Sequence, residues 1–326
     1  MADNSGRTHF VGVDLGGTKI LSGVFDARLR LLGQAKTSTK SQRGPEVVIE
    51  RVARCVRESI DECDLSEKQV RAVGIGAPGA VDPERGDVVF APNLGWKEVQ
   101  LAKELEKHLG LPVFLENDCK ACMMGVYEVE LKSKPRHALG IFIGTGIGGG
   151  MVVNGDFNSG SSFTAGEIGH MVIDVHGPKC GCGNNGCFEA LSSRLALFRE
   201  IQSAIKKGEK TLLTEMLGED LNDLRSGDIR KAIRRGDKVV EKLVQDAAEY
   251  AGVAVANLIN ILNPEVVVMG GGVIEALGDE MMPTLTKVAK SHVLSGTFRN
   301  VSIVASKLGD KAGITGAAVL AREHSR

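Results

Sequence analysis

The sequence has almost no excess of charge of either sign and few aromatic residues. Its 40 Lys and Arg are offset by 41 Asp and Glu, for a formal net charge of −1. Such a chain has no bulk attraction to nucleic acid or to an anionic membrane. With one Trp and two Tyr in 326 residues, it also lacks the aromatic platform on which proteins stack single strands. Both shortages disfavour a nucleic-acid-binding or membrane-binding protein.

Long apolar runs are missing as well. No run approaches the ~18 residues that a membrane-spanning helix needs, and the first ten residues, MADNSGRTHF, contain no apolar core of a signal peptide. Hydrophobic content of 43% and charged content of 25% are ordinary for a soluble globular protein. We therefore expect a soluble, cytoplasmic protein, and 326 residues are enough for two domains.

The seven cysteines are an odd number and do not suggest a disulfide framework. Three of them, Cys180, Cys182 and Cys187, fall within eight residues, and His170 lies ten positions before the first. Three thiolates and one imidazole suit a tetrahedral zinc ion, and four protein ligands leave no open position. The spacing therefore predicts a structural zinc site. Two carboxylates, Glu167 and Glu189, bracket it.

Two glycine-rich turns each join a pair of short apolar runs. Asp14-Leu-Gly-Gly-Thr-Lys19 lies between two such runs, and Gly144–Gly150 repeats the arrangement later in the chain. Glycines let the backbone approach a ligand and offer N–H groups to anionic oxygens. An ordinary hairpin turn is the alternative for either one alone. The repeat predicts a duplicated architecture whose halves clamp a phosphate chain.

Two other phosphate-binding motifs were weighed against this interpretation. The second turn matches G-x-G-x-x-G through Gly144, Gly146 and Gly149, but that dinucleotide motif requires a following helix. A β-like run follows here, so we discount a dinucleotide fold. The sequence contains no G-x-x-x-x-G-K-[ST], which excludes a P-loop.

Apolar periodicity alternates between helical and extended segments, which predicts an α/β domain with a largely parallel sheet. The expected helices are Pro45–Cys63, Lys97–Leu109, 118 to about 130 and a buried Asp246–Leu262, and the expected strands include Val70–Ala77, Pro112–Leu115 and Glu265–Met269. We expect Lys206–Asp237, which holds many charged residues, to form a solvent-exposed helical surface. Asn117 and Asp118 follow one strand, where they suit either a helix cap or a ligand site.

Taken together, these segments resemble the ROK family of sugar kinases and sugar-responsive repressors, within the actin/hexokinase-like ATPase superfamily. Asp14–Lys19 and Gly144–Gly150 resemble its two phosphate motifs, and Gly270-Gly-Gly272 resembles its nucleoside-binding turn. Glu167-Ile-Gly-His170 and Cys180–Glu189 match its zinc and sugar signature. The resemblance implies a two-domain actin-like fold, a duplicated ribonuclease H-like architecture with a cleft between the domains. Residues 1–118, completed by the C-terminal helix 313–326, would form the small domain, and residues 119–312 the large one.

The resemblance also implies an ATP-dependent, Mg²⁺-dependent hexokinase that phosphorylates the 6-hydroxyl of glucose, with Asp118 as general base. Sugar hydroxyls would be bound by Asn93, Asn117, Asp118, Glu167, His170 and Glu189. Phosphates and nucleoside would meet Asp14, Gly16, Gly17, Thr18, Lys19, Gly144, Thr145, Gly146, Gly270, Gly271 and Gly272. Structural Zn²⁺ would be held by His170, Cys180, Cys182 and Cys187. A homodimer or a higher homo-oligomer is implied too.

Several alternatives remain open at this point. The acceptor could be an N-acetylhexosamine or fructose, and the donor polyphosphate. Family repressors carry an added N-terminal helix-turn-helix domain, whereas this chain enters its first strand near residue 10, so a sugar sensor is the weaker reading. Cys119 and Lys120 depart from the small or amide residues that commonly follow the Asn-Asp pair. We expect Cys119 to face the sheet and Lys120 to be exposed.

Overall fold

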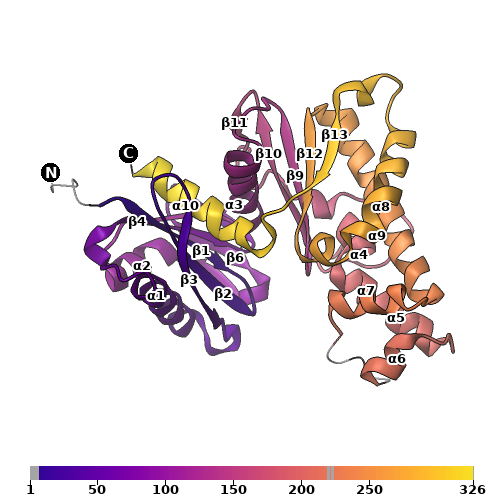
Figure 1. The fold of residues 1–326 in the computed structure, drawn as a ribbon, viewed down its shortest axis with the longest axis horizontal. Coiled ribbons are helices and arrows are strands. Elements are labelled where there is room, and N and C mark those ends of the chain that lie inside the picture. The colour runs from indigo at the N-terminus through magenta and orange to yellow at the C-terminus, as the bar shows by residue number, and fades with distance from the viewer. Residues whose placement is uncertain (1–6, 219–220, 222–223, 326) are drawn as a thin grey trace. The chain divides into compact units, whose positions relative to one another are not determined.

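The computed structural model describes residues 7–218, 221 and 224–325 (Figure 1). Contacts between residues divide it into two compact units. Unit 1 holds the chain up to Lys134, the segment Gly150–Gly166 and the chain from Asp310 onward. Unit 2 holds Pro135–Gly149 and Glu167–Gly309. The domain boundary expected at residue 118 stays a prediction, and each unit is described here by itself.

Unit 1 is built on a five-stranded sheet in the order β3-β2-β1-β4-β8. Its strands are β1 (His9–Leu15), β2 (Lys19–Phe25), β3 (Leu31–Ser38), β4 (Val70–Ala77) and β8 (Val113–Asn117). The first three are antiparallel neighbours, whereas β4 lies parallel to β1 and β8 parallel to β4. Because helices cover both faces, the central strands are almost wholly buried, as the continuous apolar runs of the sequence predict.

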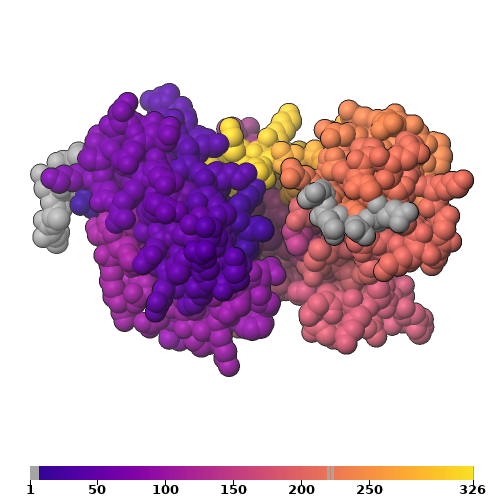
Figure 2. Space-filling view, turned by 90° about the horizontal axis from the view of Figure 1, so that it is seen from below, coloured from indigo at the N-terminus to yellow at the C-terminus, as the bar shows by residue number. Residues whose placement is uncertain are grey.

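One face of this sheet packs against α1 (Pro45–Asp61) and α2 (Leu101–Leu109), and the other against α10 (Ala312–His324). The outer face of α1 carries four exposed charged side chains, Glu50, Arg54, Arg57 and Glu58. Figure 2 shows the surface of the N-terminal part of the chain in indigo and purple. The helix therefore shows the amphipathic pattern of a surface helix.

Small residues set the position of α3 (Asp118–Gly125) against α10. A methyl group added at Gly12 or Gly74 would lie 1.8 or 1.9 Å from carbonyl oxygens of α10, and one at Gly316 would lie 1.5 Å from the carbonyl oxygen of Ala121 in α3. Only glycine permits such backbone contact. The start of the last helix therefore packs with its backbone directly against β1, β4 and α3.

The second five-stranded sheet repeats the order of the first, β11-β10-β9-β12-β13. Its strands are β9 (Ala138–Ile143), β10 (Ile147–Val153), β11 (Asp156–Phe157), β12 (Val266–Gly270) and β13 (Ser302–Ala305). Again β12 lies parallel to β9 and to β13, while β11 is antiparallel to β10. The shared strand order agrees with the duplicated architecture that the repeated glycine turns predict, and each turn joins the first two strands of its sheet.

The remaining elements complete the two units. A three-stranded sheet in unit 1 contains β5 (Ala80–Asp82), β6 (Asp87–Ala91) and β7 (Trp96–Val99). Unit 2 adds the helices α4 (Phe188–Ser192), α5 (Arg194–Lys206), α6 (Leu212–Leu217), α7 (Ser226–Arg234), α8 (Lys238–Leu262) and α9 (Gly272–His292). Short turns of helix are η1 (Ser41–Arg43), η2 (Glu67–Gln69), η3 (Pro92–Leu94), η4 (Val126–Glu130), η5 (Ile168–His170), η6 (Thr297–Asn300) and η7 (Gly309–Lys311).

Most expected helices and strands are confirmed, but some differ in their bounds. The helix expected from Lys97 begins at Leu101, because Trp96–Val99 pairs with β6 as a strand. The helix expected to reach residue 130 widens into a π-helical turn after Gly125. The Lys206–Asp237 prediction falls partly outside the described residues, since 219–220 and 222–223 are not among them. Within the described part of the chain, no helix has the length and hydropathy needed to cross a bilayer.

Candidate active site

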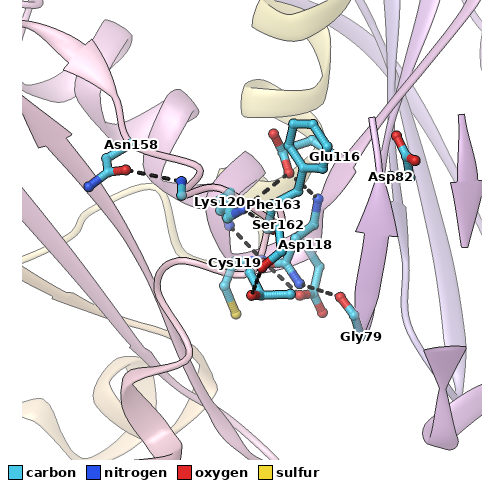
Figure 3. Close-up of polar contacts among 12 residues, drawn as sticks. Gly79, Asp82, Glu116, Asp118, Cys119, Lys120, Asn158, Ser162 and Phe163 are labelled. Carbon is cyan, nitrogen blue, oxygen red and sulfur yellow. Dashed lines mark hydrogen bonds and ion pairs between the residues drawn. The ribbon is translucent and has the colours of Figure 1, made fainter. Parts of the chain in front are cut away.

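The junction of β8 and α3 fixes Asn117 and Asp118 through backbone hydrogen bonds. Asn117 caps α3: its Oδ1 accepts from the N–H groups of Cys119 (3.0 Å) and Lys120 (3.2 Å), and its Nδ2 donates to the carbonyl of Gly79 (3.0 Å). The N-cap reading of Asn117 is confirmed. Asp118 Oδ1 accepts from the Cys119 N–H at 2.8 Å, and the residue stays partly exposed. A carboxylate is thus held in one orientation at the carboxyl end of a parallel strand (Figure 3).

The first glycine turn lies in the same unit. The Gly16 N–H donates to the carbonyl of Lys19 at 2.9 Å and closes the turn. Asn93, in η3, approaches Gly17 so closely that a methyl group there would lie 3.1 Å from its carbonyl oxygen. Thr18 and Asn93 are exposed. The turn therefore keeps an open face bordered by an asparagine, as a phosphate or sugar site requires.

The pKa of the Asp14 carboxyl group is far above its ordinary value. Although the residue keeps some exposed surface, protein atoms surround its carboxyl group, and this burial raises the pKa to about 7. The negative charge of Asp118 raises it further, Lys19 opposes the rise, and Asp310 adds to it. Lys19 Nζ in turn pairs with Asp310 Oδ2 at 2.6 Å. A cluster of three carboxylates and one ammonium group favours bound cations, since a cation would offset the repulsion.

The second glycine turn, in unit 2, is tied to two side chains of neighbouring helices. Its Gly144 N–H donates to the carbonyl of Gly146 at 2.8 Å. Arg194 donates its backbone N–H to Gly144 and its guanidinium to the Thr145 hydroxyl. Glu189 Oε2 accepts from the N–H of Ile147 at 2.8 Å. The turn is therefore held from α4 and α5 while Thr145 remains exposed.

The Cys/His cluster brings together four side chains that could hold a metal ion. The ligand atoms of four residues all lie within 4.8 Å of one another, those of His170, Cys180, Cys182 and Cys187. Cys182 Sγ lies 3.7 Å from Cys187 Sγ, and Cys180 Sγ lies 3.8 Å from His170 Nδ1. With zinc–sulfur bonds of about 2.3 Å, two sulfurs of a tetrahedral site lie about 3.8 Å apart. The 3.7 and 3.8 Å separations are therefore close to those that zinc requires.

Both bracketing carboxylates lie beside this cluster. His170 turns Nδ1 toward the thiols, and its Nε2 lies 3.9 Å from Glu167 Oε2. Glu189 Oε1 lies 3.9 Å from Cys180 Sγ. Glu167 is exposed and Glu189 partly exposed. The predicted residues Glu167, His170 and Glu189 are therefore brought together in unit 2, with oxygen and nitrogen atoms that can bind hydroxyl groups.

The third glycine run forms the turn between β12 and α9. Gly271 has a φ of 86°, which favours glycine, and a methyl group there would lie 2.5 Å from the carbonyl oxygen of Ile143. Gly272 is the first residue of α9 and is exposed. The turn thus packs on the end of β9 and presents a helix N-terminus, a place that suits anionic or polar groups.

Comparison with known proteins identifies the family. The ROK family model matches residues 10–324. A glucokinase of Streptomyces coelicolor is 35% identical over 316 residues, covering 96% of this chain and 97% of the relative. The chain belongs to the ROK family. A ROK family glucokinase from Streptomyces griseus, solved in complex with glucose and AMPPNP, superposes with a TM-score of 0.85 at 33% identity and covers 97% of this chain and 99% of the other.

Membership confirms the predicted family and the two-domain actin-like α/β fold, and the protein is a sugar kinase. Repressors are related too: a putative xylose repressor of Caldicellulosiruptor sp. is 30% identical over 94% of this chain, which corresponds to 76% of the repressor. This ROK kinase thus covers 97% of the glucokinase but 76% of the repressor.

The structure of this ROK kinase adds site residues that the sequence analysis missed and corrects one that it considered. Asp310, just before α10, and Arg194, at the start of α5, contact predicted residues without belonging to any motif. Lys120 was expected to be exposed, and this is wrong: only 6% of the residue is exposed. Its ammonium group donates a hydrogen bond to the Phe163 carbonyl in the segment after β11 and lies 3.8 Å from Glu116 Oε1 in β8. Cys119 is partly exposed.

Proposed function

We propose that this protein is a glucokinase that transfers the terminal phosphoryl group of ATP to the 6-hydroxyl of glucose, yielding ADP and glucose 6-phosphate. The observation that carries the proposal is the fixed, partly exposed carboxylate of Asp118 at the carboxyl end of β8, with one oxygen held by a backbone N–H. The glucokinase relatives support the choice of sugar and donor.

Asp118 is proposed as the general base. A sugar hydroxyl is a poor nucleophile near neutral pH, so a positioned carboxylate must accept its proton during attack. The Cys119 N–H donates to Oδ1 of Asp118, which helps to orient the carboxylate. Phosphoryl transfer otherwise depends on positioning and charge neutralisation. The Asn93 and Asn117 amides are proposed to orient the sugar. Glu167 and Glu189 are proposed to accept hydrogen bonds from its other hydroxyls, and His170 to donate one.

The phosphates are proposed to meet the two glycine turns, where the Thr18 and Thr145 hydroxyls and the glycine N–H groups are the donors. The run Gly270–Gly272 is proposed to receive the nucleoside. Mg²⁺ would neutralise phosphate charge, and the carboxylate cluster of Asp14, Asp118 and Asp310 suits a divalent cation. Asp14 would then act as the anionic partner that the cation keeps deprotonated, directly or through water.

Zinc is proposed to occupy the Cys/His cluster as a structural ion. All four positions would be filled by protein atoms, so the ion would take no part in the reaction. Its task would be to orient His170: with Nδ1 on the metal, Nε2 is left to donate to a sugar hydroxyl or to Glu167. The 3.9 Å between Nε2 and Glu167 Oε2 supports that arrangement.

The proposal is tested by replacing Asp118 with Asn, which keeps the side chain's shape and removes the base. We expect kcat to fall by about 10² to 10⁴-fold, while glucose binding, measured by calorimetry, changes little. A D118N enzyme that keeps near-normal kcat would show that another group accepts the proton.

Substrate choice is tested by ADP release over glucose, mannose, fructose, N-acetylglucosamine and N-acetylmannosamine, with ATP and polyphosphate compared as donors. N-acetylhexosamine kinases remain the second candidate, because they share the zinc and glutamate pattern. A chain inactive on every sugar would instead favour the sensing role found among repressors. Homo-oligomerisation and a cytoplasmic location stay predictions, the first to be tested by sedimentation.

A further inference from the structure

Lys120 is a buried cation two residues after the proposed base. Its Nζ donates to the carbonyl oxygen of Phe163 at 2.5 Å and lies 3.8 Å from Glu116 Oε1. The side chain is 8% exposed and that of Glu116 11%. Figure 3 shows Lys120 reaching from the start of α3 toward Glu116 and Phe163. A buried ammonium group is costly unless it is paired and hydrogen-bonded, so the contacts of Lys120 must offset the cost of burying its charge.

Glu116 offsets the charge of Lys120, but it is not the hydrogen-bond acceptor of the ammonium group. Burial raises the pKa of the Glu116 carboxyl, while the Asn117 N–H, Lys120 and His324 lower it. Its Oε1 accepts from the Asn117 N–H at 2.8 Å. At 3.8 Å from that oxygen, Nζ lies too far for a hydrogen bond. The direct bond of Lys120 goes to Phe163, on a different segment of unit 1.

That segment, residues 158–166, follows β11 and leads directly to Glu167. It is closed by its own hydrogen bonds, from Gly160 N–H to Asn158 Oδ1 (3.0 Å) and from Ala165 N–H to the Ser159 carbonyl (3.1 Å). Phe163 has a φ of 58°, a backbone conformation that costs a non-glycine residue energy. A strained residue stays in place only when its surroundings hold it, and Lys120 supplies such a contact.

Lys120 and Phe163 both border a cavity. This cavity of about 470 Å³ lies within unit 1 and is lined by residues that include Glu116, Lys120, Met124, Phe157, Phe163 and His324. Among the described lining residues, Lys120 is the only Lys or Arg. Since residues 158–166 are all exposed or only partly buried, packing fixes the segment weakly and a single hydrogen bond has a large share in fixing it.

We propose that Lys120 is a positioning residue of this sugar kinase: its ammonium group holds segment 158–166 against the β8–α3 junction before the sugar binds. The proposal rests on the proposed function, in which Asn117 and Asp118 at that junction and Glu167 at the end of the segment bind the sugar. Lys120 touches no substrate. It lowers the ordering cost that sugar binding would otherwise bear.

The consequence is a specific kinetic pattern. Replacing Lys120 with Met keeps most of the apolar stem and removes the donor. We expect the KM for glucose to rise about tenfold while kcat and the KM for ATP change less than about twofold, the pattern of a lost ground-state contact. Amide hydrogen exchange within 158–166, measured without substrate, should speed up by a similar factor, because the opening of the segment becomes easier.

K120M alone also leaves Glu116 buried without its cation, which could destabilise unit 1. The double variant E116Q/K120M removes both charges and still lacks the bond to Phe163. If Lys120 positions the segment, the double variant has a near-native Tm but keeps the raised glucose KM and the fast exchange. K120R, which retains a charged donor next to a cavity with room for it, should restore both. K103M, at an exposed lysine of α2, is the matched substitution control.

The proposal is overturned if E116Q/K120M shows wild-type glucose KM or wild-type exchange in 158–166. It is also overturned if the variants lower kcat or ATP affinity as strongly as glucose affinity, since that would indicate a general disturbance. A wild-type enzyme inactive on every hexose would refute the proposed function and the kinetic role together. The exchange rates, measured without substrate, would still show whether Lys120 holds the segment.

Discussion

Gly146 offers a direct test of how the second glycine turn and the acidic residue Glu189 depend on each other. A methyl group at Gly146 would lie 2.3 Å from Glu189 Oε2 and 3.1 Å from its Cδ, whereas carbon–oxygen contacts need more than 3 Å. Gly146 is not among the glycines with positive φ, so alanine suits its backbone. G146A therefore acts through one contact, and the carboxylate must retreat by about 1 Å, enough to weaken a hydrogen bond steeply.

Glu189 then loses its 2.8 Å bond with the Ile147 N–H, and leaving a buried donor unpaired costs about 1 to 3 kcal/mol. Ile147 is buried, so water replaces the carboxylate poorly. We expect kcat/KM for glucose to fall about 10 to 100-fold, since a misplacement of about 1 Å in a site has effects of that size.

Steady-state kinetics with glucose and ATP varied in turn would measure the effect, and zinc content would show that the Cys/His cluster persists. G227A in α7, where an added methyl group meets no atom within 4 Å, is the control for replacing a glycine with alanine. Wild-type kcat/KM in G146A would refute the reasoning, because it would mean that Glu189 can move without loss.

Two further predictions concern Asp14 and the metal. Above pH 3.8 Asp14 ionises in the unfolded chain, whereas in the folded protein it keeps its proton up to about pH 7. As the pH rises through this window, the free energy of unfolding of the wild type should therefore fall by at most about 4 kcal/mol relative to that of D14N. Urea unfolding at several pH values measures it, and a constant difference would contradict the raised pKa. C187A, at a fully buried cluster residue, should lose zinc and lower Tm, unlike C63A; metal analysis of both variants checks this.

Local motifs explain why much of the site could be predicted. The glycine turns, the Cys/His spacing and Asn117-Asp118 each need only a few consecutive residues, and the structure places them at strand ends and in one ligand cluster. The duplication could also be predicted locally, because a glycine hairpin begins each sheet. These features depend on backbone conformation and side-chain type, which the sequence shows directly.

The parts that could not be predicted depend on contacts between distant segments. Asp310 meets Lys19 across 291 positions, and no spacing rule relates the two. The sequence predicts a helix directly after Trp96, but in the structure the residues from Trp96 form β7, which pairs with β6. Lysine side chains are mostly exposed, and the carbonyl that accepts from Lys120 belongs to segment 158–166, about 40 positions later in the chain. In each case tertiary pairing overrides the local pattern.

Glu189 links two features that the sequence presents as separate. Its Oε1 lies 3.9 Å from Cys180 in the metal-binding cluster, and its Oε2 accepts from Ile147 directly after the second glycine turn. A change in the cluster must therefore reach the turn through one side chain of α4. If zinc loss displaced only the proposed sugar-binding residues, glucose KM alone would respond. Because Glu189 also supports the turn that is proposed to hold phosphate, removal of zinc should raise the KM values for both glucose and ATP.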